Sequence, residues 1–157
     1  MRFGRAWSSA HQAEGRKLAE MGRYTEAIAE YHRALGISEK MLAPDGNRSV
    51  IERDAFQIEL DLTRALAISG DRATALETVH GAAARAAPLG RAARAEANLA
   101  LAEVYHKFGD CERVTELTRA MQQEIERIGP QVEYDSPAGT IRRARALAAT
   151  CTASTQK

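Results

Sequence analysis

The chain has 157 residues, a formal net charge of +1 at neutral pH, and aromatic side chains at only 5% of its positions. A chain of this length can bury most of its unfolded surface in one domain without metals or disulfides. The small net charge excludes a strong overall field, so we expect neither nucleic acid nor a membrane as a partner.

Abundant alanine and only four prolines favour an all-α chain. The longest apolar stretches are broken by charges well short of the ~20 residues that span a bilayer. The first residues also lack the apolar segment of a signal peptide, so we expect a cytoplasmic protein. Arginine outnumbers lysine 18 to 4, which is typical of GC-rich bacterial genomes and indicates a bacterial source.

The first predicted helix pair carries the clearest spacing of small and aromatic residues. We expect helices over residues 5–21 and 24–42, with a close approach of the second helix at a glycine of the first. A second glycine can take the positive φ that ends the first helix. The residues that form this pattern are Gly15-x2-Leu18, Gly22-x-Tyr24 and Ala27-x3-Tyr31-x2-Ala34-Leu35.

The second predicted pair covers residues 50–87. Ser49 and Glu52 have the spacing of a capping box that starts a helix. Gly70 ends this helix, Asp71 caps the next one, and that helix should end before Pro88.

The third predicted pair covers residues 91–128 and is followed by one more helix. Its turn contains Gly109 and Asp110, and Gly129 and Pro130 end its second helix. Pro137 marks the start of a final helix over about 137–151, which should cover the apolar end of the third pair. We expect a single domain over residues 1–152 and a disordered tail over 153–157.

The turn glycines Gly22, Gly70 and Gly109 are 48 and 39 residues apart, and similar small and apolar residues surround each of them. The pattern resembles the tetratricopeptide repeat (TPR), a helix–turn–helix unit of about 34 residues. The longer spacing is similar to the variant of kinesin light chains and many bacterial regulators. The resemblance implies a right-handed α-solenoid of three repeats, at about 6–43, 50–87 and 91–128, with a capping helix.

The resemblance also implies a function and a site. Repeats of this kind stack into a scaffold whose concave groove, lined by the first helix of each pair, binds proteins or peptides without catalysis. We expect Leu60 and Leu99 to be apolar anchors in this groove, between charged residues that select the partner. A merely solvated face is the alternative. The groove residues that the resemblance implies are Gln12, Arg16, Glu20, Gln57, Leu60, Asp61, Arg64, Glu96, Leu99, Glu103, His106 and Lys107.

Other functions are possible but less favoured by the sequence. An atypical end repeat could pack against a second copy and give a homodimer. A carboxylate clamp for a chaperone tail is disfavoured, because Asp61 and Glu96 fall at clamp positions and would repel an acidic ligand. The basic cluster at residues 142–145 lacks interleaved aromatic residues, so we expect a solvated face and not a nucleic-acid site.

Two patterns could carry catalysis. Glu77/His80 and Glu103/His106 have the Glu-x-x-His spacing of di-metal helical enzymes, but they fall on consecutive predicted helices. Cys111 follows His106 by five residues and could form a nucleophile pair with it. We expect instead that both cysteines are reduced and structural, that the chain is not an enzyme, and that it needs no cofactor or metal.

Overall fold

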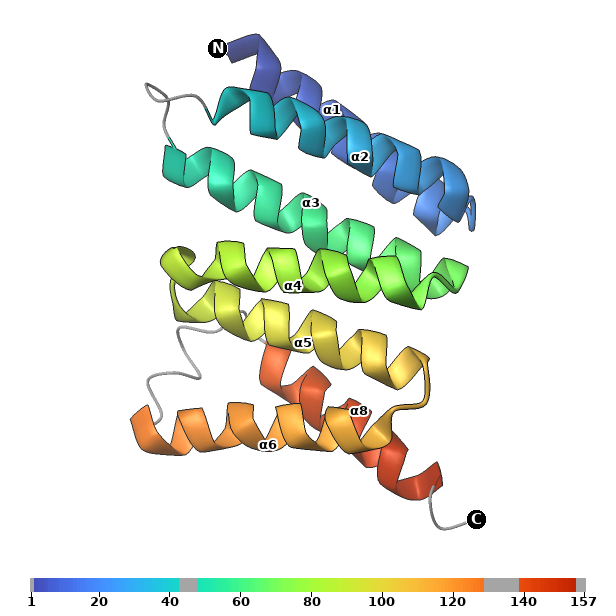
Figure 1. The fold of residues 1–157 in the computed structure, drawn as a ribbon, viewed down its shortest axis with the longest axis vertical. Helices are drawn as coiled ribbons and strands as arrows, with labels where there is room; N and C mark the ends of the chain where they lie inside the picture. Colours follow the sequence, from blue (N-terminus) through green and yellow to red (C-terminus); the bar gives the residue numbers. More distant parts are fainter. Residues whose placement is uncertain (1, 43–47, 129–138, 155–157) are drawn as a thin grey trace.

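The computed structural model describes residues 2–42, 48–128 and 139–154, and the protein is all-helical in these ranges (Figure 1). No β-strand occurs in them. None of the described helices combines the length and the apolar character needed to cross a membrane. The helices are α1 (Arg2–Glu20), α2 (Tyr24–Met41), α3 (Arg48–Ser69), α4 (Arg72–Leu89), α5 (Arg91–Lys107), α6 (Cys111–Ile128) and α8 (Thr140–Ser154).

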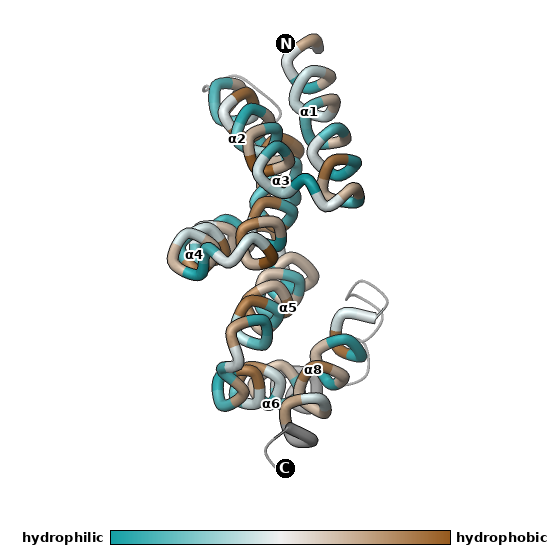
Figure 2. The backbone as a smooth tube through the Cα atoms, turned by 90° about the vertical axis from the view of Figure 1, so that its right-hand side faces the viewer, coloured by the Kyte–Doolittle hydropathy of each residue, from teal (hydrophilic) through white to brown (hydrophobic). Residues whose placement is uncertain are grey.

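Helices α1 to α6 are stacked in chain order along the long axis of the molecule, and α8 lies beside α5 and α6 (Figure 1). Each helix from α1 to α5 packs against the next, and α8 packs against both α5 and α6. Contacts between α1 and α3, and between α3 and α5, join alternate helices. Figure 2 shows α4 on one side of the stack, α1 and α8 on the other, and α3 and α5 between them. We call the face formed by α1, α3, α5 and α8 the inner face.

The first hairpin is held by a close approach at Gly15, as predicted. A Cβ atom on this residue would lie 2.6 Å from the Cε1 atom of Tyr31, a ring that is itself buried. Ala27 and Ala34 of α2 are completely buried at the same interface. Buried Ser8 donates a hydrogen bond to the carbonyl oxygen of Ala34 at 2.9 Å. The α1–α2 interface therefore tolerates no side chain at residue 15 without displacement of the ring.

The three hairpin turns share one geometry. Their glycines, Gly22, Gly70 and Gly109, have φ values of 75°, 93° and 75°, as the sequence predicted. After each glycine, the next residue donates its backbone N–H to the carbonyl five positions earlier, at 2.9–3.0 Å. This is the bond of a Schellman motif, which satisfies a carbonyl at the helix end and requires a left-handed residue. The same local chemistry thus turns the chain three times.

Four predicted boundaries were wrong. α1 begins at Arg2, three residues before the predicted start. α4 continues through Pro88 to Leu89, because a proline in the final turn removes only one helical bond. α3 begins at Arg48, so Ser49 lies within its first turn, and Glu52 pairs with Arg85 of α4 at 2.5 Å. α8 continues to Ser154, two residues into the segment predicted as disordered. The predicted start of this helix at Pro137 lies outside the described residues.

The two cysteines form a disulfide, which corrects the expectation of reduced thiols. Cys111 is the first residue of α6 and Cys151 lies near the end of α8, with a Cα–Cα distance of 5.3 Å. The bond adds to a cluster in which Tyr105 and Val114 are buried. Two cysteines 40 residues apart have no spacing that indicates a bond. Only the antiparallel packing of α6 and α8 brings them together.

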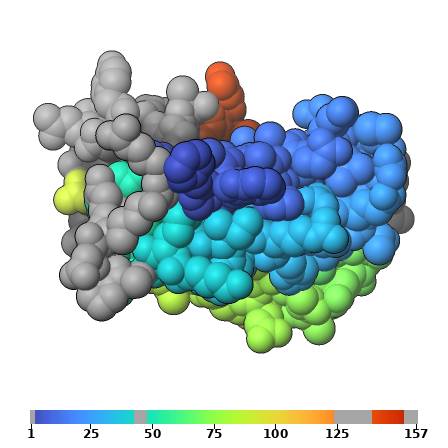
Figure 3. All heavy atoms as spheres, turned by 90° about the horizontal axis from the view of Figure 1, so that it is seen from above, coloured from blue at the N-terminus to red at the C-terminus, as the bar shows by residue number. Residues whose placement is uncertain are grey.

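The two ends of the stack differ in how their apolar residues are covered. At the C-terminal end, α8 buries Leu99 and Met121 beneath Ile141 and Ala144. At the N-terminal end, seen from above in Figure 3, α1 and α2 form the surface of the molecule. There Phe3 is 81% exposed and Trp7 62% exposed. The N-terminal end therefore leaves aromatic surface exposed.

Candidate functional site

The inner face carries a series of polar contacts that join its helices. Between α1 and α3, Gln12 Nε2 and Arg16 Nε donate to the same Asp61 carboxylate oxygen, at 2.8 and 2.7 Å. Near the other end of α1, Arg5 Nε donates to Asp54 at 2.6 Å. The polar residues of α1 and α3 thus bond to each other.

The same arrangement recurs between α3 and α5. Gln57 Nε2 donates to Glu96 at 2.7 Å, and Arg64 Nε donates to Glu103 at 2.8 Å. Glu103 also accepts a hydrogen bond from Arg143 of α8. The residues in these pairs are 39 or 40 positions apart, and those between α1 and α3 are 45 or 49 positions apart. These offsets are close to the spacings of the turn glycines.

The structure therefore gives most of the predicted charged residues a role within the stack. Gln12, Arg16, Asp61 and Glu96 are all hydrogen-bonded to inner-face neighbours. Pairs that are partly exposed contribute little to stability one by one. Their effect is to fix side-chain positions across the face.

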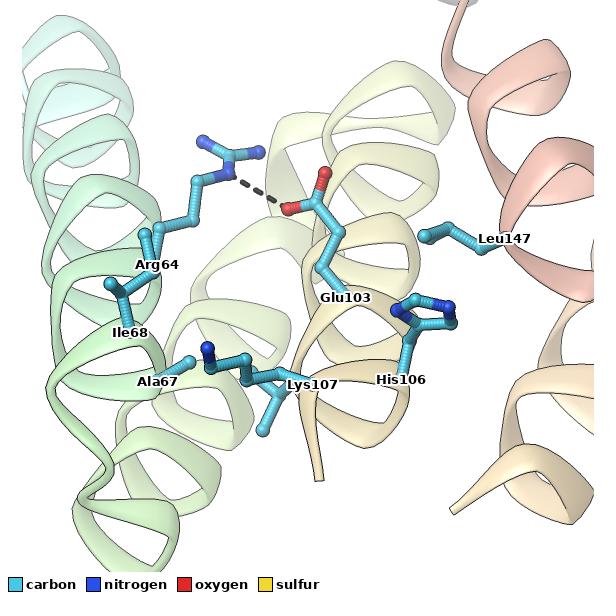
Figure 4. A pocket seen from close by; sticks show the side chains of 8 residues that line it. Arg64, Ala67, Ile68, Glu103, His106, Lys107 and Leu147 are labelled. Atoms are coloured by element: carbon cyan, nitrogen blue, oxygen red, sulfur yellow. Dashed lines mark hydrogen bonds and ion pairs between the residues drawn. The ribbon is translucent and has the colours of Figure 1, made fainter. Parts of the chain in front are cut away.

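Two hollows lie on the inner face. One, of about 300 Å³, is bordered by α3, α5 and α8 (Figure 4). The other, of about 230 Å³, lies between α1, α2 and α3. Arg64 and Ile68 border both. Each volume is at or below the lower end of the range for small-molecule pockets, about 300 Å³, so each suits a side chain better than a cofactor.

The first hollow is largely apolar in its lining. Ala67 and Val104 are buried on α3 and α5, and Leu147 of α8 approaches from the opposite side (Figure 4). Arg64 and Glu103 meet across it in the ion pair described above. His106 also borders it, and its Nε2 lies 2.8 Å from the hydroxyl of Thr150 on α8.

Two predicted anchors do not reach the inner surface. Leu60 is 1% exposed and packs with Phe56 and Val79, and Leu99 is 2% exposed beneath α8. A side chain with this burial cannot meet a ligand unless helices separate, so their assignment as apolar anchors was wrong. Leu60 faces the core, where it packs against Val79 of α4, whereas Leu99 is buried because α8 covers it.

The apolar residues that do line the hollows were missed. Ile68 lies one helical turn after Arg64 and is 46% exposed. A continuation of the predicted row on α3 by four positions would have reached it. Leu147 could not be found in this way, because its place depends on how α8 packs against α5 and α6.

Tyr31 forms part of the wall of the second hollow. Burial raises the pKa of its phenol from 10.0 to about 12, and the neighbouring Asp61 carboxylate acts in the same direction. The phenol is therefore neutral at physiological pH. It contributes a rigid aromatic wall and a hydroxyl group, and not a charge.

Neither the Glu-x-x-His pairs nor the Cys111/His106 pair forms a complete catalytic site among the described residues. Within the described ranges, no group of three or more His, Cys, Asp or Glu side chains is placed to hold a metal ion. The carboxylate of Glu103 is engaged by Arg64 and Arg143. The sulfur of Cys111 is bonded to Cys151, so it is not available as a nucleophile in this state.

Comparison with known proteins adds no identification. No protein-family model, no curated protein and no solved structure matches the chain.

Proposed function

We propose that this protein is a non-catalytic binding module, built as a TPR-like right-handed solenoid, whose inner face holds a peptide segment of a partner protein. The observation that carries the proposal is the repeated register of the inner face. The offsets of 39–49 residues in its polar contacts follow the glycine spacings of 48 and 39. A face that repeats in this way presents successive, similarly spaced side chains to an extended ligand.

The hollows support the proposal by their size and lining. They lie on either side of Ile68, which is partly exposed, and their volumes are at or below the lower end of the range for small-molecule sites. Binding energy at such surfaces comes from a few anchoring side chains in small hollows, while polar neighbours set specificity. A peptide can supply side chains to both hollows at once.

Peptide selection followed by footprinting tests this function. A random peptide library is selected on the full chain, and hydrogen exchange maps where selected peptides protect the backbone. We expect protection on α3 and α5, and a loss of at least tenfold in affinity when Arg64 is changed to Ala, because this residue borders both hollows and its pair with Glu103 orders the surface between them. Arg119, which is exposed on α6, supplies the matched control, and Arg119→Ala should bind normally. Protection confined to α4 and α6 contradicts the proposal.

Self-association is a second candidate function, favoured by the exposed aromatic residues of α1. Phe3 and Trp7 lie one helical turn apart on the same face of this helix. Exposed aromatic clusters of this kind commonly mark protein–protein contacts. Sedimentation at increasing concentration should show a dimer that Trp7→Glu abolishes. A concentration-independent monomer rejects this candidate and leaves the peptide-binding proposal untouched.

The cytoplasmic location expected from the sequence stays a proposal; the Cys111–Cys151 disulfide counts against it and provides its test. Disulfides persist mainly in oxidising compartments and are rare in reducing ones. Alkylation of intact cells with a permeant reagent should therefore label both cysteines if the protein is in the cytoplasm. Protection of both cysteines until a reductant is added indicates an oxidising compartment.

A further inference from the structure

Three residues of the inner face take no part in the polar contacts between helices described above. Glu20, Ile68 and Lys107 lie at the C-terminal ends of α1, α3 and α5, and all three are exposed. Glu20 and Lys107 form no ion pair with another described residue. The neighbouring charges Arg16, Asp61, Arg64 and Glu103 are all paired. The unpaired charges are therefore the ones available to a ligand.

These three residues have a fixed order across the face. Glu20 borders the smaller hollow, Lys107 borders the larger one, and Ile68 borders both. In Figure 4 the Lys107 side chain extends toward α3, beside Ala67 and Ile68. An acidic group, an apolar group and a basic group thus follow one another across three helices.

We propose that the ligand of the inner face is a peptide segment with the complementary order: a basic residue for Glu20, an apolar residue for Ile68, and an acidic residue for Lys107. This inference rests on the proposed function and specifies its partner. The apolar residue would occupy the larger hollow, over Ala67 and Val104, where the lining is mostly apolar. The two charges at the edges would select peptides by electrostatic complementarity.

The spacing of the segment follows from helix packing. Packed helices lie about 8–10 Å apart, and an extended chain advances ~3.3 Å per residue. The basic and acidic residues should therefore each lie about three positions from the central apolar residue, on opposite sides of it.

The charge pattern disfavours a purely anionic ligand such as nucleic acid. Glu20 lies at one edge of the site and would repel a phosphate backbone. The guanidinium groups of Arg16 and Arg64 are already paired with Asp61 and Glu103, so they are not free to bind phosphate. A peptide that carries one basic and one acidic residue pairs with both Glu20 and Lys107.

A three-by-three binding experiment tests the charge order. Peptides of equal length carry the central leucine with one basic and one acidic flank, two basic flanks, or two acidic flanks. Each is titrated by fluorescence anisotropy against the wild-type chain, Lys107→Glu and Glu20→Lys. A zwitterionic peptide can bind with its chain in either direction across the face. Changes in charge composition are therefore a cleaner test than reversal of the sequence.

Each protein should prefer a different peptide. We expect wild type to bind the zwitterionic peptide at least tenfold more tightly than the other two. Lys107→Glu should prefer the doubly basic peptide, and Glu20→Lys the doubly acidic one. Replacement of the central leucine by aspartate, or Ile68→Asp in the protein, should weaken every preferred pair at least tenfold.

Matched controls on the outer helices separate local from overall charge effects. Glu77→Lys on α4 and Arg119→Glu on α6 make the same charge changes at exposed positions away from the inner face. They should leave all three affinities unchanged, and circular dichroism melts should show every variant folded. Equal binding of all three peptides to each inner-face variant overturns the inference but leaves peptide binding intact. Failure of any peptide to bind, including library-selected ones, overturns both.

Discussion

The two ends of the stack differ in how far their apolar residues are covered. At the C-terminal end, α8 covers Leu99 and Met121, and a disulfide links it to the first residue of α6. At the N-terminal end, Phe3 and Trp7 are largely exposed, while the opposite side of α1 packs closely on α2 through Gly15. Stacked helix pairs leave an apolar surface at each end. In this chain α8 covers the surface at the C-terminal end. The surface at the N-terminal end is available for a partner or a second copy.

The largest expected effect on stability comes from removal of the disulfide at the C-terminal end. Changing Cys111 and Cys151 to serine opens a loop of 40 residues. Loop-closure entropy predicts a loss of about 3–4 kcal/mol in the free energy of unfolding. Hydrogen exchange should accelerate in α8 while α1 keeps its protection, as expected for a stack in which each unit contacts only its neighbours. Equal acceleration at both ends would show that the stack unfolds as one unit.

An aspartate placed at each end should distinguish covered from open surface. Ile141 is 7% exposed, so Ile141→Asp buries a charge without a partner and should cost about 3 kcal/mol in urea unfolding. Trp7 is 62% exposed, so Trp7→Asp should change the stability of the monomer by less than about 0.5 kcal/mol. A large loss at Trp7 in dilute solution would mean that the N-terminal end is already covered in solution.

Substitution of Gly15 tests how tightly α1 is held. A Cβ atom there would overlap the ring of Tyr31, so Gly15→Ala should destabilise the protein by about 2 kcal/mol. Gly81 is the matched control, because it lies inside α4 with nothing within 4 Å of its Cβ position. Gly81→Ala should stabilise the protein by about 0.5–1 kcal/mol. If both changes have the same sign, the close approach at Gly15 is not what orders this hairpin.

The smallest effect near neutral pH is that of Tyr31, whose phenol changes the stability only at high pH. The pKa of its phenol is raised to about 12 in the folded protein, against an ordinary value of 10.0. Because the folded pKa is the higher one, the contribution of this group is complete below pH 10 and is lost as the pH rises through about 12. An ultraviolet absorbance titration should show one tyrosine ionising late, and Tyr31→Phe should remove that step. Its persistence in the variant would assign the late step to another tyrosine.

Much of the fold was predictable because the signals that encode it are local. Gly22, Gly70 and Gly109 end their helices in a left-handed conformation, which residues with a Cβ rarely adopt. Asp71 caps α4 by accepting a hydrogen bond from the backbone of Thr74, as expected for its position. Each of these depends on only a few neighbouring residues.

The candidate site was only partly predictable, because burial depends on the rotation of each helix. The resemblance placed Arg64 and Glu103 on the inner face, but nothing in the sequence showed that they bond to each other. Leu60 was predicted to be exposed and is buried, and Ile68 was not considered and is exposed. A rotation of the helix about its axis by one residue position exchanges a core residue for a surface residue. Only the packing of the helix against its neighbours fixes this rotation.

The amino-acid sequence by itself determined the helices, the turns between them and the spacing at which the hairpins recur. These features follow from backbone conformational preferences and hydrogen bonds within a few residues. Only the tertiary structure decided that Cys111 meets Cys151, that Arg143 reaches Glu103, and that Glu20 and Lys107 keep unpaired charges. Contacts between residues 40 positions apart depend on where α8 packs, and that is set by the apolar surface that the other helices leave uncovered.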